Sequence, residues 1–90
     1  MVHYTYILYS QNFDKYYIGQ TNEIVGRLKR HNSGSETATQ PFIPWTLLWY
    51  TEKSSRAEAM LLEKKLKNLS KLRIKSFILK YSVENLLGKI

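Results

Sequence analysis

Two short segments rich in β-branched and aromatic residues lie at the start of the sequence, and four residues separate them. Residues 3–10 read HYTYILYS, residues 15–19 read KYYIG, and the connection reads QNFD. Side chains of these types favour strands, and a short connection of turn-forming residues favours antiparallel pairing. The pattern therefore predicts a β-hairpin. A loop of four residues places Leu8 opposite Tyr17, and Tyr6 diagonal to Tyr17 on the same face.

A helical pattern follows the hairpin. Thr21 or Asn22 can cap this helix, and Glu23 then lies in its first turn, where a negative charge is favourable near the positive end of the helix dipole. Residues 32–34 read NSG, which is typical of a helix C-terminus. Residues 33–44 are predicted to form a polar loop that contains both prolines.

The second half of the chain predicts one strand and two helices. Residues 45–50 read WTLLWY and have strand composition. Ser55 and Glu58 have the spacing of a capping box for the next helix, and Ser70 can cap the last one. The apolar residues expected to face the core from the first of these helices are Ala59, Leu62, Leu66 and Leu69. The predicted order is β-β-α-β-α-α, an α+β fold with a small three-stranded antiparallel sheet flanked by helices.

The length and the charge of the chain limit its class. Ninety residues form a single domain, which we place at residues 1–80, with residues 81–90 as a helical turn or tail. Fourteen Lys and Arg against seven Asp and Glu leave a net charge of +7, which favours a polyanionic partner such as nucleic acid or an anionic membrane. The absence of cysteine excludes disulfides and thiol-rich zinc sites. No secretory signal or membrane span is visible, so we expect a cytoplasmic protein without membrane contact.

Tyrosine, arginine, histidine and glutamate recur on these elements in an order that matches a known family. The first strand contains YTY at residues 4–6, the second contains YIG at residues 17–19, and the two following long helices carry the charged groups. The residues with functional side chains in this set are Tyr6, Tyr17, Arg27, His31 and Glu63. In this order they resemble the GIY-YIG nucleases, and the resemblance covers roughly residues 4–80.

The resemblance has two departures and several points of agreement. Tyr4 and Thr5 stand where the family name has glycine and isoleucine, whereas Gly19 of the second motif is kept. The segment HNSG at residues 31–34 and the dipeptide PW at residues 44–45 are similar to the small stand-alone members of the family.

The resemblance implies a metal-dependent endonuclease that hydrolyses DNA phosphodiester bonds. It implies that Glu63 holds a single Mg²⁺ or Mn²⁺ ion with most of its waters retained and that Arg27 clamps a phosphate. Either Tyr6 or Tyr17 would serve as the base, and His31 would relay a proton or bind a phosphate. Because no base-reading element is visible, we expect structure-selective or non-specific cutting, as in DNA repair. The alternative is a partner protein that supplies targeting, and we expect the chain to be a monomer or weak dimer.

Basic side chains on the helices are candidates for contact with the DNA backbone. These candidates are Lys29, Arg30, Lys64, Lys67 and Lys71. Such contacts would weaken steeply as salt rises. A run of charge on a helix is also the usual composition of a solvated face.

Each site residue also has a structural interpretation when it is taken alone. The tyrosines can be packed strand aromatics, Arg27 can pair with Glu23 one turn earlier, and Glu63 can pair with a lysine one turn later. Trp45 and Trp49, four residues apart in a predicted strand, would share one face and pack in the core, or stack on an unpaired base. Two other functions fit the fold: a non-catalytic nucleic-acid-binding module and a protein-interaction domain. Neither explains why these residue types occur together in the family order.

Overall fold

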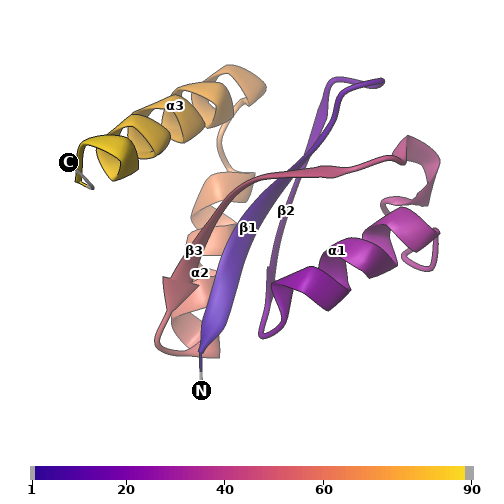
Figure 1. Ribbon diagram of the computed structural model, residues 1–90, viewed down its shortest axis with the longest axis horizontal. Helices are drawn as coiled ribbons and strands as arrows, with labels where there is room; N and C mark the ends of the chain where they lie inside the picture. The colour runs from indigo at the N-terminus through magenta and orange to yellow at the C-terminus, as the bar shows by residue number, and fades with distance from the viewer. Residues whose placement is uncertain (1, 89–90) are drawn as a thin grey trace.

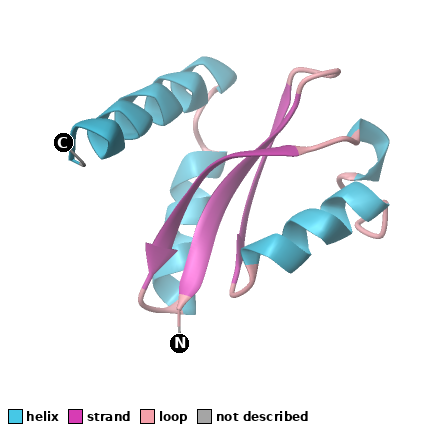
Figure 2. Ribbon diagram, in the orientation of Figure 1, coloured by secondary structure: helices cyan, strands magenta, loops and turns pink. Residues whose placement is uncertain are grey.

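The computed structural model describes residues 2–88, with side chains through residue 81. Its three strands form one antiparallel sheet in the order β2-β1-β3. The elements, in chain order, are β1 (His3–Ser10), β2 (Lys15–Thr21), α1 (Ile24–Ser33), the short 3₁₀ helix η1 (Gln40–Phe42), β3 (Thr46–Lys53), α2 (Arg56–Lys67) and α3 (Lys71–Gly88). This order and this sheet confirm the predicted α+β fold (Figure 1, Figure 2).

Helices cover both faces of the sheet, and each face has its own core (Figure 1). On one face α1 packs over a cluster whose buried members are Tyr6, Leu8 and Trp45. On the other face Leu66 of α2 and Ile74 of α3 pack against Ile7, Ile18 and Trp49 of the sheet. Successive residues of a strand point to opposite faces, so the central strand β1 contributes alternately to the two cores. The Tyr6 side chain therefore lies on the α1 face.

The hairpin has the register that the sequence predicted. Leu8 pairs with Tyr17, and Tyr6 pairs with Gly19, which leaves the two tyrosines diagonal to one another on the same face. Strand β2 continues two residues beyond its predicted end, to Thr21. The hairpin thus brings both tyrosines and the glycine of the second motif into one small area of the sheet.

The two tryptophans do not share a face, and the sequence expectation was wrong on this point. Ile7 of β1 pairs with Trp49, but the next residue, Leu8, pairs two residues earlier in β3, which leaves Leu48 as an extra residue. Such a bulge moves the side chains on its two sides out of simple alternation. Trp45 packs on the α1 face and Trp49 on the α2 face. Both are buried, with 5% and 9% exposure, so neither offers a free ring face to a base.

Helix α1 begins one or two residues later than predicted, and its cap is the residue expected in its first turn. Glu23, rather than Thr21 or Asn22, is the N-cap, and its carboxylate accepts a hydrogen bond of 2.6 Å from the Gly26 amide. A Cβ atom at Gly26 would collide with that carboxylate, so the glycine leaves space for this cap. Gly34 ends the helix in the left-handed conformation with φ of 85°, as predicted.

The other two helices begin where the sequence predicts. Ser55 caps α2 by accepting a hydrogen bond from the Glu58 amide, but the Glu58 carboxylate binds Ser54 instead of completing the capping box. Ser70 accepts a hydrogen bond from an amide in the first turn of α3. Helix α3 runs to Gly88 without a break at residue 81, and the division of the chain at that residue stays a prediction. Among residues 2–88, no helix is both long enough and apolar enough to cross a bilayer.

Candidate active site

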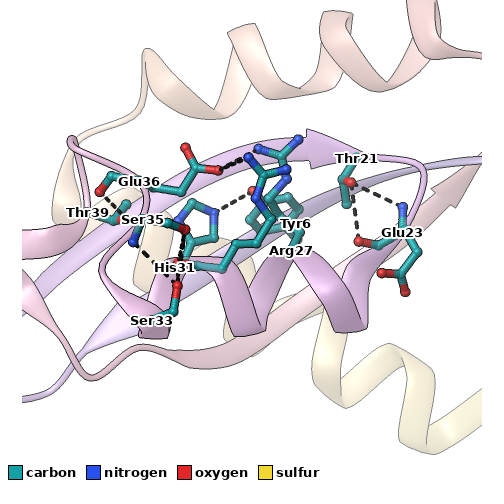
Figure 3. Close-up of polar contacts among 10 residues, drawn as sticks. Tyr6, Thr21, Glu23, Arg27, His31, Ser33, Ser35, Glu36 and Thr39 are labelled. Atoms are coloured by element: carbon teal, nitrogen blue, oxygen red, sulfur yellow. Dashed lines mark hydrogen bonds and ion pairs between the residues drawn. The ribbon is translucent and has the colours of Figure 1, made fainter.

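A buried hydrogen bond joins Tyr6 and His31, the one on the central strand and the other on the last turns of α1. The Tyr6 hydroxyl oxygen lies 3.0 Å from Nε2 of His31 (Figure 3). The two residues are 3% and 1% exposed. Polar side chains so deeply buried cost free energy unless they are paired. The sequence placed both residues in the candidate site, and the tertiary structure makes them partners.

The second nitrogen of His31 is bound as well, and its partner favours one tautomer. Nδ1 lies 2.9 Å from the Thr39 hydroxyl oxygen, and that hydroxyl donates to the carbonyl oxygen of Glu36 at 3.4 Å. With the Thr39 proton directed there, we assign the proton of the imidazole to Nδ1, which donates to Thr39, and the lone pair of Nε2 then accepts from Tyr6. Burial lowers the pKa of His31, which favours this neutral imidazole. Thr39 was missed in the sequence because no local pattern marks a single loop threonine.

Tyr17 contacts both members of this pair. Its ring centroid lies 6.5 Å from that of Tyr6 and 4.9 Å from that of His31, and its side chain is half-buried. Burial raises the pKa of Tyr17, and the negative charge of Glu63 raises it further. The pKa of Tyr6 is raised by burial and then by Tyr17. Both phenols are therefore protonated at neutral pH.

Glu63 is partly buried on α2, the helix that packs on the face of the sheet opposite to Tyr6 and α1. It raises the pKa of both phenols, and its carboxylate oxygen lies 3.8 Å from Lys67 Nζ, the partner expected one turn later. Within residues 2–88, whose side chains are described through residue 81, no group of three or more His, Cys, Asp or Glu residues converges as a metal site. A single carboxylate is compatible with Mg²⁺, which keeps several waters and binds through one or two carboxylates and substrate phosphates.

Arg27 lies beside the tyrosines but pairs with a different glutamate from the one expected. Its Nη1 atom lies 3.2 Å from Glu36 Oε1, whereas Glu23 caps the helix. Arg30, one turn further along α1, places Nη2 at 3.3 Å from the same Glu36 oxygen. The charge of Arg27 lowers the pKa of both Tyr6 and Tyr17. Glu36 was missed because it lies in the loop after α1, and only the path of that loop brings it back over the helix (Figure 3).

The candidate DNA-binding residues are exposed but do not share one face. Lys29 and Arg30 lie on α1, and the remaining three lie on α2 and α3, across the sheet. Lys71 donates a hydrogen bond of 2.9 Å to Asp14 at the tip of the hairpin, and Lys67 pairs with Glu63. Exposed ion pairs of this kind contribute about 0–1 kcal/mol. Contact of these residues with DNA stays a prediction.

Comparison with known proteins gives one family and one similar solved structure. A family model described as the GIY-YIG catalytic domain matches residues 2–76. A UPF0213 protein from Bacillus halodurans, solved by NMR in solution, is 32% identical to this chain. The similarity covers 87% of this chain and 83% of that protein, with a TM-score of 0.56. No curated protein has a significant match to the sequence.

Proposed function

The chain belongs to the GIY-YIG catalytic-domain family, a nuclease-type family, and from this premise we propose that it hydrolyses DNA phosphodiester bonds with one divalent metal ion. The observation that carries the proposal is the buried hydrogen bond between Tyr6 and His31. A neutral imidazole whose free lone pair faces a phenol is an arrangement suited to proton transfer.

Tyr6 is the proposed general base. As a water molecule attacks the phosphorus atom, its proton passes to the Tyr6 oxygen, the Tyr6 proton passes to Nε2 of His31, and the bond from phosphorus to the leaving oxygen breaks. Thr39 holds the imidazole in the tautomer that can accept this proton. Nε2 then returns its proton to Tyr6 as the Tyr6 hydroxyl gives the other one to the leaving oxygen, which restores the pair. Tyr17 has a positioning role in this scheme, because its ring packs against both partners.

Positive charge near the phenols completes the proposed chemistry. Arg27 would bind a phosphate oxygen of the scissile group, since a guanidinium matches phosphate geometry and stays charged. Glu63 would hold Mg²⁺ or Mn²⁺. When bound, the metal polarises the phosphate and offsets the negative charge that now raises the pKa of both tyrosines. The position of Arg27, whose charge lowers the pKa of both tyrosines, supports its proposed role.

The proposed substrate is DNA of unusual structure, or DNA without sequence preference. Reading a sequence requires contacts to base edges, and we find no motif for such contacts in the sequence. Both tryptophans are buried and unavailable for stacking. We therefore propose that branched, flapped or single-stranded DNA is cut better than linear duplex. We also propose that a partner protein supplies targeting and that the protein acts in DNA repair in the cytoplasm.

Cleavage of a DNA panel tests this function. Linear duplex, single strand, flap and four-way junction are incubated with Mg²⁺ or Mn²⁺, and wild type is compared with Glu63→Ala. A matched control is Glu52→Ala, which removes the same charge from an exposed position on β3. Metal-dependent cutting that is lost only in Glu63→Ala supports the proposal. DNA binding that is equal in all three proteins, without cutting, would instead indicate the non-catalytic binding module.

A further inference from the structure

Two arginines of α1 converge on one carboxylate oxygen beside the candidate site. Arg27 and Arg30 place guanidinium nitrogens 3.2 and 3.3 Å from Oε1 of Glu36. Figure 3 shows the Glu36 side chain reaching from the loop toward the guanidinium of Arg27. Neither contact is predicted by the sequence. Two positive charges thus face a single negative charge that comes from outside the helix.

This arrangement of donors is the one that binds a phosphate oxygen. Arginine is favoured at phosphate sites because its planar fork supplies several donors and a permanent charge. The Glu36 oxygen stands where a phosphate oxygen would accept the hydrogen bond of Arg27 and pair with the charge of Arg30. The pair is accessible to a ligand, since the side chains of Arg27 and Arg30 are 34% and 62% exposed.

We propose that Arg27 and Arg30 form a phosphate site and that Glu36 is its displaceable internal ligand. The identity of the natural ligand as a DNA phosphate rests on the proposed nuclease function. In the free protein the carboxylate holds the two guanidiniums together beside Tyr6. An incoming phosphate replaces it and finds both donors already positioned. The carboxylate therefore preorganises the site and also competes for it.

The loop can release this carboxylate without losing its support of the imidazole. The carbonyl oxygen of Glu36 accepts hydrogen bonds from the Gln40 amide at 2.9 Å and from the Thr39 amide at 3.2 Å. These bonds involve only the backbone of Glu36. Thr39 therefore stays beside His31 when the Glu36 side chain turns away. Displacement is a change of one side chain, which a ligand can drive at low cost.

Titration with pyrophosphate tests the site directly. The side-chain N–H signals of Arg27 and Arg30 are followed by NMR in wild type, Glu36→Gln and Glu52→Gln. The amide keeps the size of the carboxylate, and Glu52→Gln changes the net charge equally at an exposed position on β3. We expect Glu36→Gln to bind pyrophosphate about 3- to 10-fold more tightly than wild type, because a partly exposed ion pair no longer competes. Glu52→Gln should change the affinity less than 2-fold by comparison.

A second variant separates competition at this site from a general loosening of the loop. Arg30→Ala removes one donor, and Glu36→Gln in that background should gain less than half of the affinity that it gains in wild type. Equal pyrophosphate affinity in wild type and Glu36→Gln would overturn the proposal, as would pyrophosphate binding that leaves the Arg27 signals unchanged. The DNA panel keeps the two hypotheses distinct. DNA cutting with no effect of Glu36→Gln on pyrophosphate rejects this inference alone, and tighter pyrophosphate binding without any DNA cutting rejects the nuclease alone.

Discussion

Gly19 lies directly opposite Tyr6 in the hairpin, so close that a Cβ atom at Gly19 would be 2.5 Å from the Tyr6 hydroxyl oxygen and 2.7 Å from Cζ. No real side chain tolerates such a distance. The glycine of the Tyr-Ile-Gly motif therefore provides the space in which the phenol meets His31. The need for glycine is steric, and it is imposed by the neighbouring strand.

Gly19→Ala should displace the Tyr6 phenol and break its hydrogen bond to His31. We expect a loss of about 1–3 kcal/mol in the free energy of unfolding from overpacking and a large loss of DNA cleavage. Chemical denaturation and the cleavage panel measure the two effects. Gly26→Ala is the matched control for cleavage, because its new methyl group displaces only the capping carboxylate of Glu23 and meets no atom of Tyr6 or His31. It should keep cleavage. Normal cleavage by Gly19→Ala would show that the phenol position is unimportant.

Removal of the Tyr6 hydroxyl should impair cleavage more than removal of the Tyr17 hydroxyl. Tyr6→Phe takes away the proposed base and leaves Nε2 of His31 buried without its partner. We expect kcat to fall by about 10²- to 10⁴-fold, with about 1–3 kcal/mol of destabilisation. Tyr17→Phe keeps the ring contacts and should reduce kcat far less. The reverse order of the two kcat values would assign the base to Tyr17.

Loss of the Thr39 hydroxyl should disturb the tautomer of His31. Thr39→Val preserves the shape of the side chain but removes the acceptor of Nδ1–H. An unpaired buried donor costs about 1–3 kcal/mol, and the proton can then move to Nε2, where it prevents acceptance from Tyr6. Nitrogen NMR shifts of the His31 ring report the tautomer. Thr39→Ser should restore both the wild-type shifts and the cleavage rate, and Thr39→Val with unchanged ring shifts would contradict the assigned proton position.

The stability of the protein should fall as the solution is acidified below about pH 6.5. Burial holds the pKa of His31 below the value of 6.5 for an unperturbed histidine. Between these two pKa values the unfolded chain binds more protons than the folded one. The contribution of neutral His31 to the free energy of unfolding is therefore complete above about pH 6.5 and is lost as pH falls through the folded-state pKa. Cleavage should decline over the same range, since protonated His31 cannot accept from Tyr6. The test is to measure the free energy of unfolding of wild type and His31→Gln between about pH 4.5 and 8. This range lies above the ordinary pKa values of carboxylates. Equal slopes in the two proteins would contradict it.

Local patterns in the sequence were sufficient for most of the secondary structure. The hairpin, its register and the caps at Ser55 and Ser70 follow from neighbouring residues, whose chemistry acts over a few positions. The first helix was less accurate, because Glu23 took the cap that Thr21 or Asn22 was expected to form. Several residue types can cap a helix, and the choice among adjacent candidates depends on the path of the preceding strand.

The five candidate site residues were identified by their order along the chain. The fold places four of them close together. Tyr6, Tyr17, His31 and Arg27 lie together on the α1 face. The charge of Glu63 acts on the two phenols from α2. Their roles as catalytic and metal-binding groups stay predictions until cleavage is measured.

The sequence by itself determined which elements form and which residue types are available for chemistry, because strand pairing, helix periodicity and capping are set by residues close together in the chain. Only the tertiary structure decided the partners: that His31 bridges Tyr6 and Thr39, that Arg27 pairs with Glu36, and that the extra residue in β3 separates Trp45 from Trp49. These contacts join residues on different elements, and their geometry depends on the path of the loop after α1 and on one bulge. Neither feature has a signature within any short window of sequence.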